Sequence, residues 1–272
     1  MRSTDDAIAT EYTTPELVAA FIANDLEDGI GVMVGANLPI PRAGVLLAHL
    51  THGPNMRVTL SMTRTNLFHE PAMEPFEFST DFRAAKWAES YFIHNQLIDD
   101  IKRSSMRDVF FIGGLQIDRY GNANLIGIGA DYGHLKMRGP GGVGTGDKGC
   151  HCKRYYLYIN NHDRRVLVEK CDFVTAFGWG DGGADARRKL GIPGGGPRYC
   201  ITPLCIFDFH EETKHMRIKS LHPGVTLEQV LDQTGFAPIV PARIEITLPP
   251  TAEQIRILRE RIDREGILRR TS

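Results

Sequence analysis

The chain has 272 residues, enough to bury a substantial hydrophobic core. Its 42% hydrophobic and 24% charged residues are typical of globular proteins. With 32 Lys and Arg against 33 Asp and Glu, its net charge is -1, so no broad positive field is available to attract nucleic acid or an anionic membrane. The sequence has no run of about 18 apolar residues, and MRSTDDAIATEYT does not resemble a secretory signal. We therefore expect no nucleic-acid partner and no membrane association.

The first expected element is a helix over residues 14–27 (TPELVAAFIANDLE). Thr14 is a suitable N-cap, Pro15 suits the first helical position, and Glu16 places a carboxylate in the first turn. Apolar side chains then recur at helical spacing, so one face of this helix is expected to be buried.

A strand, a glycine turn, a helix and a second strand follow. Apolar residues 30–34 predict a strand that runs directly into a corner containing Gly35 and Asn37. Residues 41–50 predict a helix, and residues 57–61 predict the next strand. This order is typical of parallel strands with helices packed outside them.

The remaining elements extend the same pattern. A helix over about 82–102 leads to VFFI, the most strongly apolar strand of the chain, and strands then alternate with glycine-rich loops. The later expected elements are strands 155–159, 165–169 and 199–208, and helices 226–234 and 251–265, capped by Thr226 and Thr251. We predict an α/β fold with a mainly parallel sheet flanked by helices, as a single domain over residues 1–272 with a core of about 14–262.

The segment 113–124, GGLQIDRYGNAN, follows the VFFI strand. Gly-Asn pairs suit turn positions with positive φ. Asp118 and Asn122 are short polar residues that can satisfy backbone donors in such a turn. The segment therefore suits either a well-bonded structural corner or a ligand site at the carboxyl end of a strand.

A second glycine-rich segment is RGPGGVGTG, at residues 138–146. Backbone of this kind lets amide groups approach a phosphate or an oxyanion closely, and it also suits a plain connector. The spacing matches neither a P-loop nor a dinucleotide fingerprint.

Other candidate groups have simpler interpretations. The five cysteines indicate reduced thiols in a cytoplasmic protein, and Cys150-His151-Cys152 is closer-spaced than zinc ligands, so we expect no metal. His49 and His52 suit capping at a helix end. Arg119 fits either a ligand phosphate or carboxylate or a solvated surface charge. The run Arg187-Arg188-Lys189 is typical of a solvated helix face.

Several motifs together resemble the β-type chains of class I CoA-transferases, above all those of the glutaconate CoA-transferase group. GGLQIDRYGNANL is similar to the family's GG-x-Q-hydrophobic-D-x-x-GN-x-N signature, and RGPGGVG resembles its later glycine loop. VMVGANLPIPRAGVLLAHL, FVTAFGWGDGGADARRKLGIPGGGPRYCIT and SLHPGVTLEQVLDQTGF resemble further stretches in the family's order. The resemblance covers about residues 14–262.

The resemblance implies a heteromeric enzyme, a heterodimer or heterotetramer, in which an α-type subunit completes the active site. Its substrate would be an acyl-CoA thioester, with no bound cofactor. The residues that it implies for CoA or oxyanion binding are Gly35, Asn37, Gly113, Gly114, Gln116, Gly121, Asn122, Gly139, Gly141 and Gly142.

The sequence departs from this family at the catalytic nucleophile. Transferases of this class attack the thioester with a β-chain glutamate that follows the strand after the first glycine corner. Here that strand is followed by Ser61-Met62-Thr63-Arg64, so Ser61 occupies the nucleophile's position. Glu70, nine residues further on, is the nearest acid and only a weak candidate.

The missing glutamate is also a point of resemblance to a related branch, the acyl-CoA hydrolases that open the last ring in steroid degradation. HCKR at residues 151–154 and SLHPGVT at residues 220–226 are similar to the β chain of that branch. Ring-opening hydrolysis and CoA transfer therefore both remain open. Two further alternatives are a non-catalytic β-type chain that supports an active α-type partner and a free-standing homo-oligomer.

Overall fold

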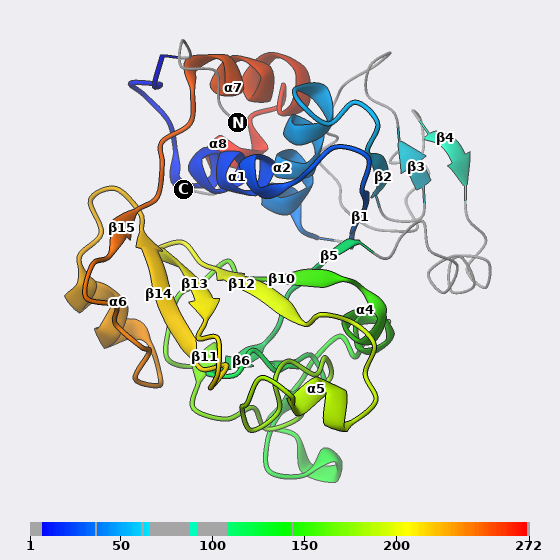
Figure 1. Ribbon diagram of the computed structural model, residues 1–272, viewed down its shortest axis with the longest axis vertical. Coiled ribbons are helices and arrows are strands. Elements are labelled where there is room, and N and C mark those ends of the chain that lie inside the picture. Colours follow the sequence, from blue (N-terminus) through cyan, green and yellow to red (C-terminus); the bar gives the residue numbers. More distant parts are fainter. Residues whose placement is uncertain are drawn as a thin grey trace. The chain divides into compact units, whose positions relative to one another are not determined.

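The computed structural model describes residues 7–35, 37–60, 108–142 and 144–270, together with the strands at 63–65 and 88–91. The chain forms two compact units, one of Met1–Asp108 with Leu248–Ser272 and the other of Val109–Thr247 (Figure 1). The expected single domain over residues 1–272 stays a prediction. No helix in the described ranges is long and apolar enough to cross a bilayer.

The first unit begins with α1 (Thr14–Asp25), which is capped by Thr13 rather than by the expected Thr14. The Thr13 hydroxyl accepts a hydrogen bond from the Glu16 amide at 3.3 Å, and the Thr13 amide donates to the Glu16 carboxylate at 2.8 Å. This reciprocal capping box requires the acid three residues after the cap, and Glu16 stands in that register only to Thr13.

α2 (Pro39–Leu50) packs directly on α1 (Figure 1). A Cβ added at Gly44 would lie 2.7 Å from the Ala19 carbonyl oxygen and 2.8 Å from Ile22 Cβ. Only glycine therefore permits this close approach of the two helices. Near the end of α2, the rings of His49 and His52 donate to the Gly53 and Leu26 carbonyl oxygens at 3.3 and 2.9 Å, in the region where capping was expected.

The predicted strand–turn–helix–strand order is confirmed in this unit. β1 (Gly31–Val34) and β2 (Arg57–Leu60) pair in parallel, with Val34 opposite Leu60. β3 (Thr63–Thr65) pairs antiparallel with β2, and β4 (Ala88–Tyr91) pairs antiparallel with β3. The helix expected over about 82–102 is wrong at residues 88–91, because pairing with β3 outweighs the local helical pattern there; its other residues lie outside the described ranges.

The second unit is built on parallel strands. β5 (Val109–Ile112), β10 (Arg154–Tyr158) and β12 (Pro197–Ile201) are parallel neighbours. β13 (Cys205–Phe209) and β14 (Met216–Leu221) continue the sheet antiparallel, and β15 (Glu245–Ile246) returns parallel to β14. These pairings confirm the expected α/β class, and they correct the single strand expected over 199–208 to two strands separated by a turn at residues 202–204.

A small separate sheet holds the glycine signature. Its strands are β6 (Gln116–Asp118), β7 (Ala123–Asn124) and β11 (Leu167–Val168), in the order β11-β6-β7. The shorter elements of the second unit are β8 (Gly127–Ile128), η2 (Tyr132–His134), β9 (Met137–Arg138), α4 (Thr145–His151), α5 (Ala186–Lys189) and α6 (Leu227–Gln233). The Thr226 cap of α6 is as predicted.

The C-terminal helices return to the first unit. α7 (Ala252–Ile257) is capped by Thr251, as predicted, and continues into a π-helical turn, η3 (Leu258–Ile262), followed by α8 (Ile267–Arg270). From η3, Arg259 donates two hydrogen bonds to the Glu16 carboxylate, at 2.7 and 3.0 Å. The Glu16 side chain is only 1% exposed, so the pair joins two distant parts of the chain within a mostly buried setting.

We predict that Glu16→Gln lowers the free energy of unfolding at neutral pH by about 2 kcal/mol. Burial by itself raises the pKa of Glu16, but the hydrogen bonds from Arg259 and Thr13 outweigh it and hold the pKa below its ordinary value. A carboxylate with a lowered folded pKa stabilises the fold above its unfolded pKa and loses that contribution as the pH falls. The difference between wild type and variant should therefore shrink on acidification below about pH 4.5, measured by urea unfolding.

Glu253→Gln is the matched control, because Glu253 pairs with Arg256 at 2.7 Å but half of its side chain is exposed. Its unfolding free energy should change little. An equal loss in both variants, or a loss in Glu16→Gln that does not depend on pH, would contradict the role assigned to Glu16.

Candidate functional site

The signature segment is held by a buried network centred on Asn122. The Asn122 side-chain amide donates to both Asp118 carboxylate oxygens, at 3.1 and 2.9 Å, and to the Gly180 carbonyl oxygen at 2.8 Å. Its carbonyl oxygen accepts from the Gly178 and Gly180 amides at 2.9 and 3.2 Å. One side chain thus fastens the turn between β6 and β7 to the loop at residues 171–180.

Asp118 lies beneath this turn as a buried acceptor. The backbone amides of Tyr120 and Asn122 donate to its carboxylate, at 3.0 and 3.1 Å. Burial raises the pKa of Asp118, although the hydrogen bonds from Asn122 and Tyr120 oppose that shift. The structure therefore agrees with the structural-corner interpretation of this pair, because all of these contacts lie within the chain.

A second amide pair fixes the other end of the same hairpin. Asn124 donates to the Gln116 side-chain oxygen at 2.7 Å and to the Gly127 carbonyl oxygen at 2.8 Å. Gln116 also accepts from the Asp172 amide at 2.9 Å. Since both side chains are buried, they hold the backbone that follows Gly113 and Gly114.

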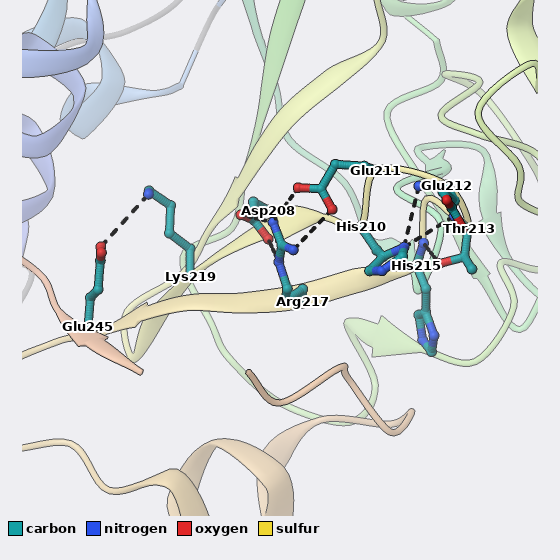
Figure 2. A network of polar contacts seen from close by, with 9 residues as sticks. All are labelled: Asp208, His210, Glu211, Glu212, Thr213, His215, Arg217, Lys219 and Glu245. Carbon is teal, nitrogen blue, oxygen red and sulfur yellow. Dashed lines mark hydrogen bonds and ion pairs between the residues drawn. The ribbon is translucent and has the colours of Figure 1, made fainter. Parts of the chain in front are cut away.

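The tip of the turn rests on the β13–β14 hairpin. Gly121, with a positive φ of 70°, lies so close to Phe209 that a Cβ would be 2.7 Å from its ring. The Met216 amide donates to the Arg119 carbonyl oxygen at 2.8 Å. Figure 2 shows how that hairpin is braced: Arg217 on β14 donates to Asp208 on β13 and to Glu211 in the connecting turn, each through two hydrogen bonds.

The Arg119 side chain contacts other residues of the chain. Its guanidinium forms an ion pair with Glu169 and lies 4.9 Å from the centre of the Tyr120 ring. The sequence left a ligand contact and a solvated charge open, and the structure provides a protein partner in place of plain solvation.

The two glycine-rich segments of the sequence come together. The Gly139 and Gly141 amides donate to the carbonyl oxygens of Ile126 and Leu125, at 2.8 and 2.9 Å. A Cβ at Gly139 would lie 2.2 Å from the Leu125 oxygen, so only glycine fits against the signature hairpin there. Gly142 lies against Thr175, whose hydroxyl accepts from the Leu125 amide at 2.9 Å.

Several other predicted site residues belong to the first unit or lie outside the described residues. Gly35 follows β1, and Asn37 adopts the left-handed conformation with φ 56° just before α2, both in the first unit. Ser61 and Glu70 lie outside the described residues, and β2 ends at Leu60.

Arg187 corrects the expected solvated helix face. It is 3% exposed and donates to the carbonyl oxygens of Gly149, Phe177, Gly178 and Gly194, at 2.6 to 3.2 Å. The exposed Arg188 and Lys189 pair instead with Asp185. A run of charged residues does not reveal which side chain points inward. The sequence therefore carried no signal that Arg187 would bind these four carbonyl oxygens.

All five cysteines are free thiols. Burial raises the pKa of Cys205 to about 12 and raises that of Cys171 and Cys200 as well. These three thiols are therefore protonated near neutral pH. Among the described residues, no three His, Cys, Asp or Glu side chains gather as metal ligands.

Sequence reasoning missed one charged residue beside the glycine loop. Lys148 on α4 is 8% exposed, and its ammonium lies 5.2 Å from the centre of the Phe110 ring on β5. Burial lowers its pKa, partly offset by the nearby charge of Asp147. The sequence signal was its position just after the glycine loop, four residues beyond Gly144.

We predict that Asn122→Ala lowers the free energy of unfolding by about 3 kcal/mol, because it leaves the Asp118 carboxylate and two glycine amides without side-chain partners. Asn161→Ala is the control, since Asn161 is exposed and should change stability by no more than about 0.5 kcal/mol. Urea unfolding of both variants measures the difference. Equal stabilities for the two variants would show that the Asn122 network is not what holds the signature turn.

Comparison with known proteins gives a consistent result. A family model described as coenzyme A transferase matches residues 16–233. The chain is 34% identical to the β subunit of 3-oxoadipate CoA-transferase from Pseudomonas knackmussii, covering 91% of this chain and 92% of that protein. It is 32% identical to the β subunit of glutaconate CoA-transferase from Acidaminococcus fermentans, covering 93% and 94%.

A hydrolase component and a solved structure are also similar. The IpdB subunit of the cholesterol ring-cleaving hydrolase of Rhodococcus jostii is 29% identical, with coverage of 93% and 94%. The crystal structure of glutaconate CoA-transferase from Acidaminococcus fermentans matches with a TM-score of 0.81 and 29% identity, covering 94% of this chain and 97% of that one.

Proposed function

Because the chain belongs to the coenzyme A transferase family, we propose that it is the β-type subunit of a heteromeric enzyme that acts on acyl-CoA thioesters. The observation that carries this proposal is the match to β subunits along more than nine tenths of both chains. The partner is an α-type subunit of the same family, in a heterodimer or heterotetramer. The thioester is the substrate, and the proposal includes no resident cofactor.

The predicted binding residues divide into two roles within this proposal. Gln116, Asn122, Gly139 and Gly141 direct their polar groups to other parts of the chain, so they act by holding backbone in place. Gly113 and Gly114 are partly exposed at the carboxyl end of β5, which suits contact with the thioester. Gly35, Asn37, Gly121 and Gly142 complete the proposed set.

Water is the acyl acceptor that the sequence favours. Ser61, Met62, Thr63 and Arg64 follow β2 without a carboxylate. A serine hydroxyl at the nucleophile's position can orient water or a substrate carbonyl, but it cannot form the acyl anhydride that transfer through a glutamate requires. The ring-cleaving hydrolase relative supports the same chemistry, with steroid-derived thioesters as a substrate class.

CoA transfer is the second candidate. The β subunits of two CoA-transferases are more similar to this chain than the hydrolase relative is, at 34% and 32% against 29% identity. Transfer requires a carboxylate from elsewhere, either Glu70 or the α-type partner. We place the enzyme in the cytoplasm, where five free thiols persist.

The test co-expresses the chain with its α-type partner and incubates the purified complex with a panel of acyl-CoA esters, with and without acceptor carboxylates. Borohydride trapping read by mass spectrometry locates any glutamyl thioester. We expect turnover that needs only water and no trapped adduct. A glutamyl adduct on either chain would establish transfer instead, and absence of turnover would leave a non-catalytic supporting role.

We further predict that Ser61→Ala lowers kcat of the complex by about tenfold or more, because the hydroxyl that orients the reactants is lost. Met62→Leu, the adjacent conservative substitution, should leave kcat unchanged. Steady-state kinetics of both variants measures the effect. Full activity in Ser61→Ala would remove Ser61 from the proposed site.

A further inference from the structure

Lys148 carries a buried charge that the fold does not use. Its side chain lies over the Phe110 ring in the second unit, and only 8% of the residue is exposed. Lysine is almost never buried to this extent without a partner, because an ammonium loses favourable hydration when it is taken out of water.

No described residue forms a hydrogen bond or ion pair with the Lys148 ammonium. The carboxylate of Asp147, the nearest acid in the sequence, lies 3.2 Å from His151 Nδ1, a contact that is an ion pair only when the imidazole is protonated. The Gly142 carbonyl oxygen accepts from the Thr145 amide and hydroxyl, at 2.7 and 2.5 Å. The ammonium therefore has the Phe110 ring and the nearby charge of Asp147 around it, but no hydrogen-bond or ion-pair partner among the described residues.

The ammonium is nevertheless not sealed in the core. Lys148 Nζ is not among the fully enclosed side-chain nitrogens of the described residues. Its methylene groups are covered, while the nitrogen keeps some contact with solvent. A ligand arriving from solvent can thus reach the charge.

Glycine keeps the approach to the ammonium open. Gly144 has φ 76°, and a Cβ there would lie 2.8 Å from Lys148 Nζ. Any other residue at this position would be strained and would crowd the charge. The Lys148 ammonium therefore lies directly beside the Gly144 backbone, whose left-handed conformation favours glycine.

We propose that the Lys148 ammonium, beside Gly144, binds an anionic oxygen of the acyl-CoA substrate. The inference rests on the proposed function and adds a binding residue to it. A bound anion would supply the missing counter-charge, so the cost of burying the unpaired ammonium in the free protein is recovered when substrate binds. The lowered pKa of Lys148 in the free chain agrees with this, because burial is its largest cause and the nearby charge of Asp147 offsets it only in part.

Two parts of the substrate carry such an oxygen, namely a carboxylate on the acyl group and the phosphates of CoA. Four probes separate them: free CoA, glutarate, butyryl-CoA and glutaryl-CoA. A contact to phosphate affects CoA and both thioesters, whereas a contact to the acyl carboxylate affects only glutarate and glutaryl-CoA.

The test compares wild-type and Lys148→Met chains, each purified in complex with the α-type partner, by titration calorimetry with the four probes. We expect Lys148→Met to weaken the binding of either the CoA-containing probes or the carboxylate-containing probes by about tenfold or more. Its melting temperature should stay the same or rise, since a buried uncompensated charge is removed. Lys136→Met is the control, because Lys136 is exposed.

Each outcome either supports the inference or argues against it. Loss of binding in either pattern with an unreduced melting temperature supports the inference. Equal affinities of wild type and Lys148→Met for every probe would overturn it, as would a lowered melting temperature with unchanged binding, which indicates a packing role. If the wild-type complex binds none of the probes, the proposed function itself fails, which is a distinct result.

Discussion

The hydrogen bonds of the Asn122 side chain are the interaction on which the candidate site depends. A single primary amide has two donor hydrogens and one carbonyl oxygen, and here both ends are used on buried partners from two segments. Because the Asp118 carboxylate and the Gly178 amide are buried, losing the Asn122 amide would leave both of them poorly satisfied. The turn and the 171–180 loop therefore hold each other in one arrangement.

Glycine has a steric role around this network. Gly139 allows the second glycine-rich segment to lie against the Leu125 backbone, and Gly121 allows the turn to lie against Phe209. The Gly121 and Gly139 amides donate to the Asp118 and Ile126 carbonyl oxygens, at 2.8 Å each, so these parts of the glycine backbone are already committed to structure. The Lys148 ammonium is different because it has no hydrogen-bond or ion-pair partner among the described residues.

Buried charged side chains in this protein differ in how many hydrogen-bond partners surround them. Glu16 and Arg187 are each surrounded by several hydrogen-bonding partners, from Arg259 and Thr13 in one case and from four carbonyl oxygens in the other. Among the described residues, Lys148 is buried to a similar degree with none. Charges that serve the fold are compensated within it, and this contrast is why the uncompensated one points to a ligand.

The sequence by itself determined the α/β class, the order of the strand–turn–helix–strand unit, and the caps at Thr226 and Thr251, because these depend on local periodicity and on short-range hydrogen bonds. It also identified the family through the signature at residues 113–124. Tertiary structure alone decided that residues 88–91 form a strand, that 199–208 is two strands, and that Arg187 and Lys148 are buried. Those outcomes depend on partners distant in sequence, a strand edge for Ala88–Tyr91 and carbonyl groups from α4 and two loops for Arg187, and no local pattern specifies which distant groups will meet.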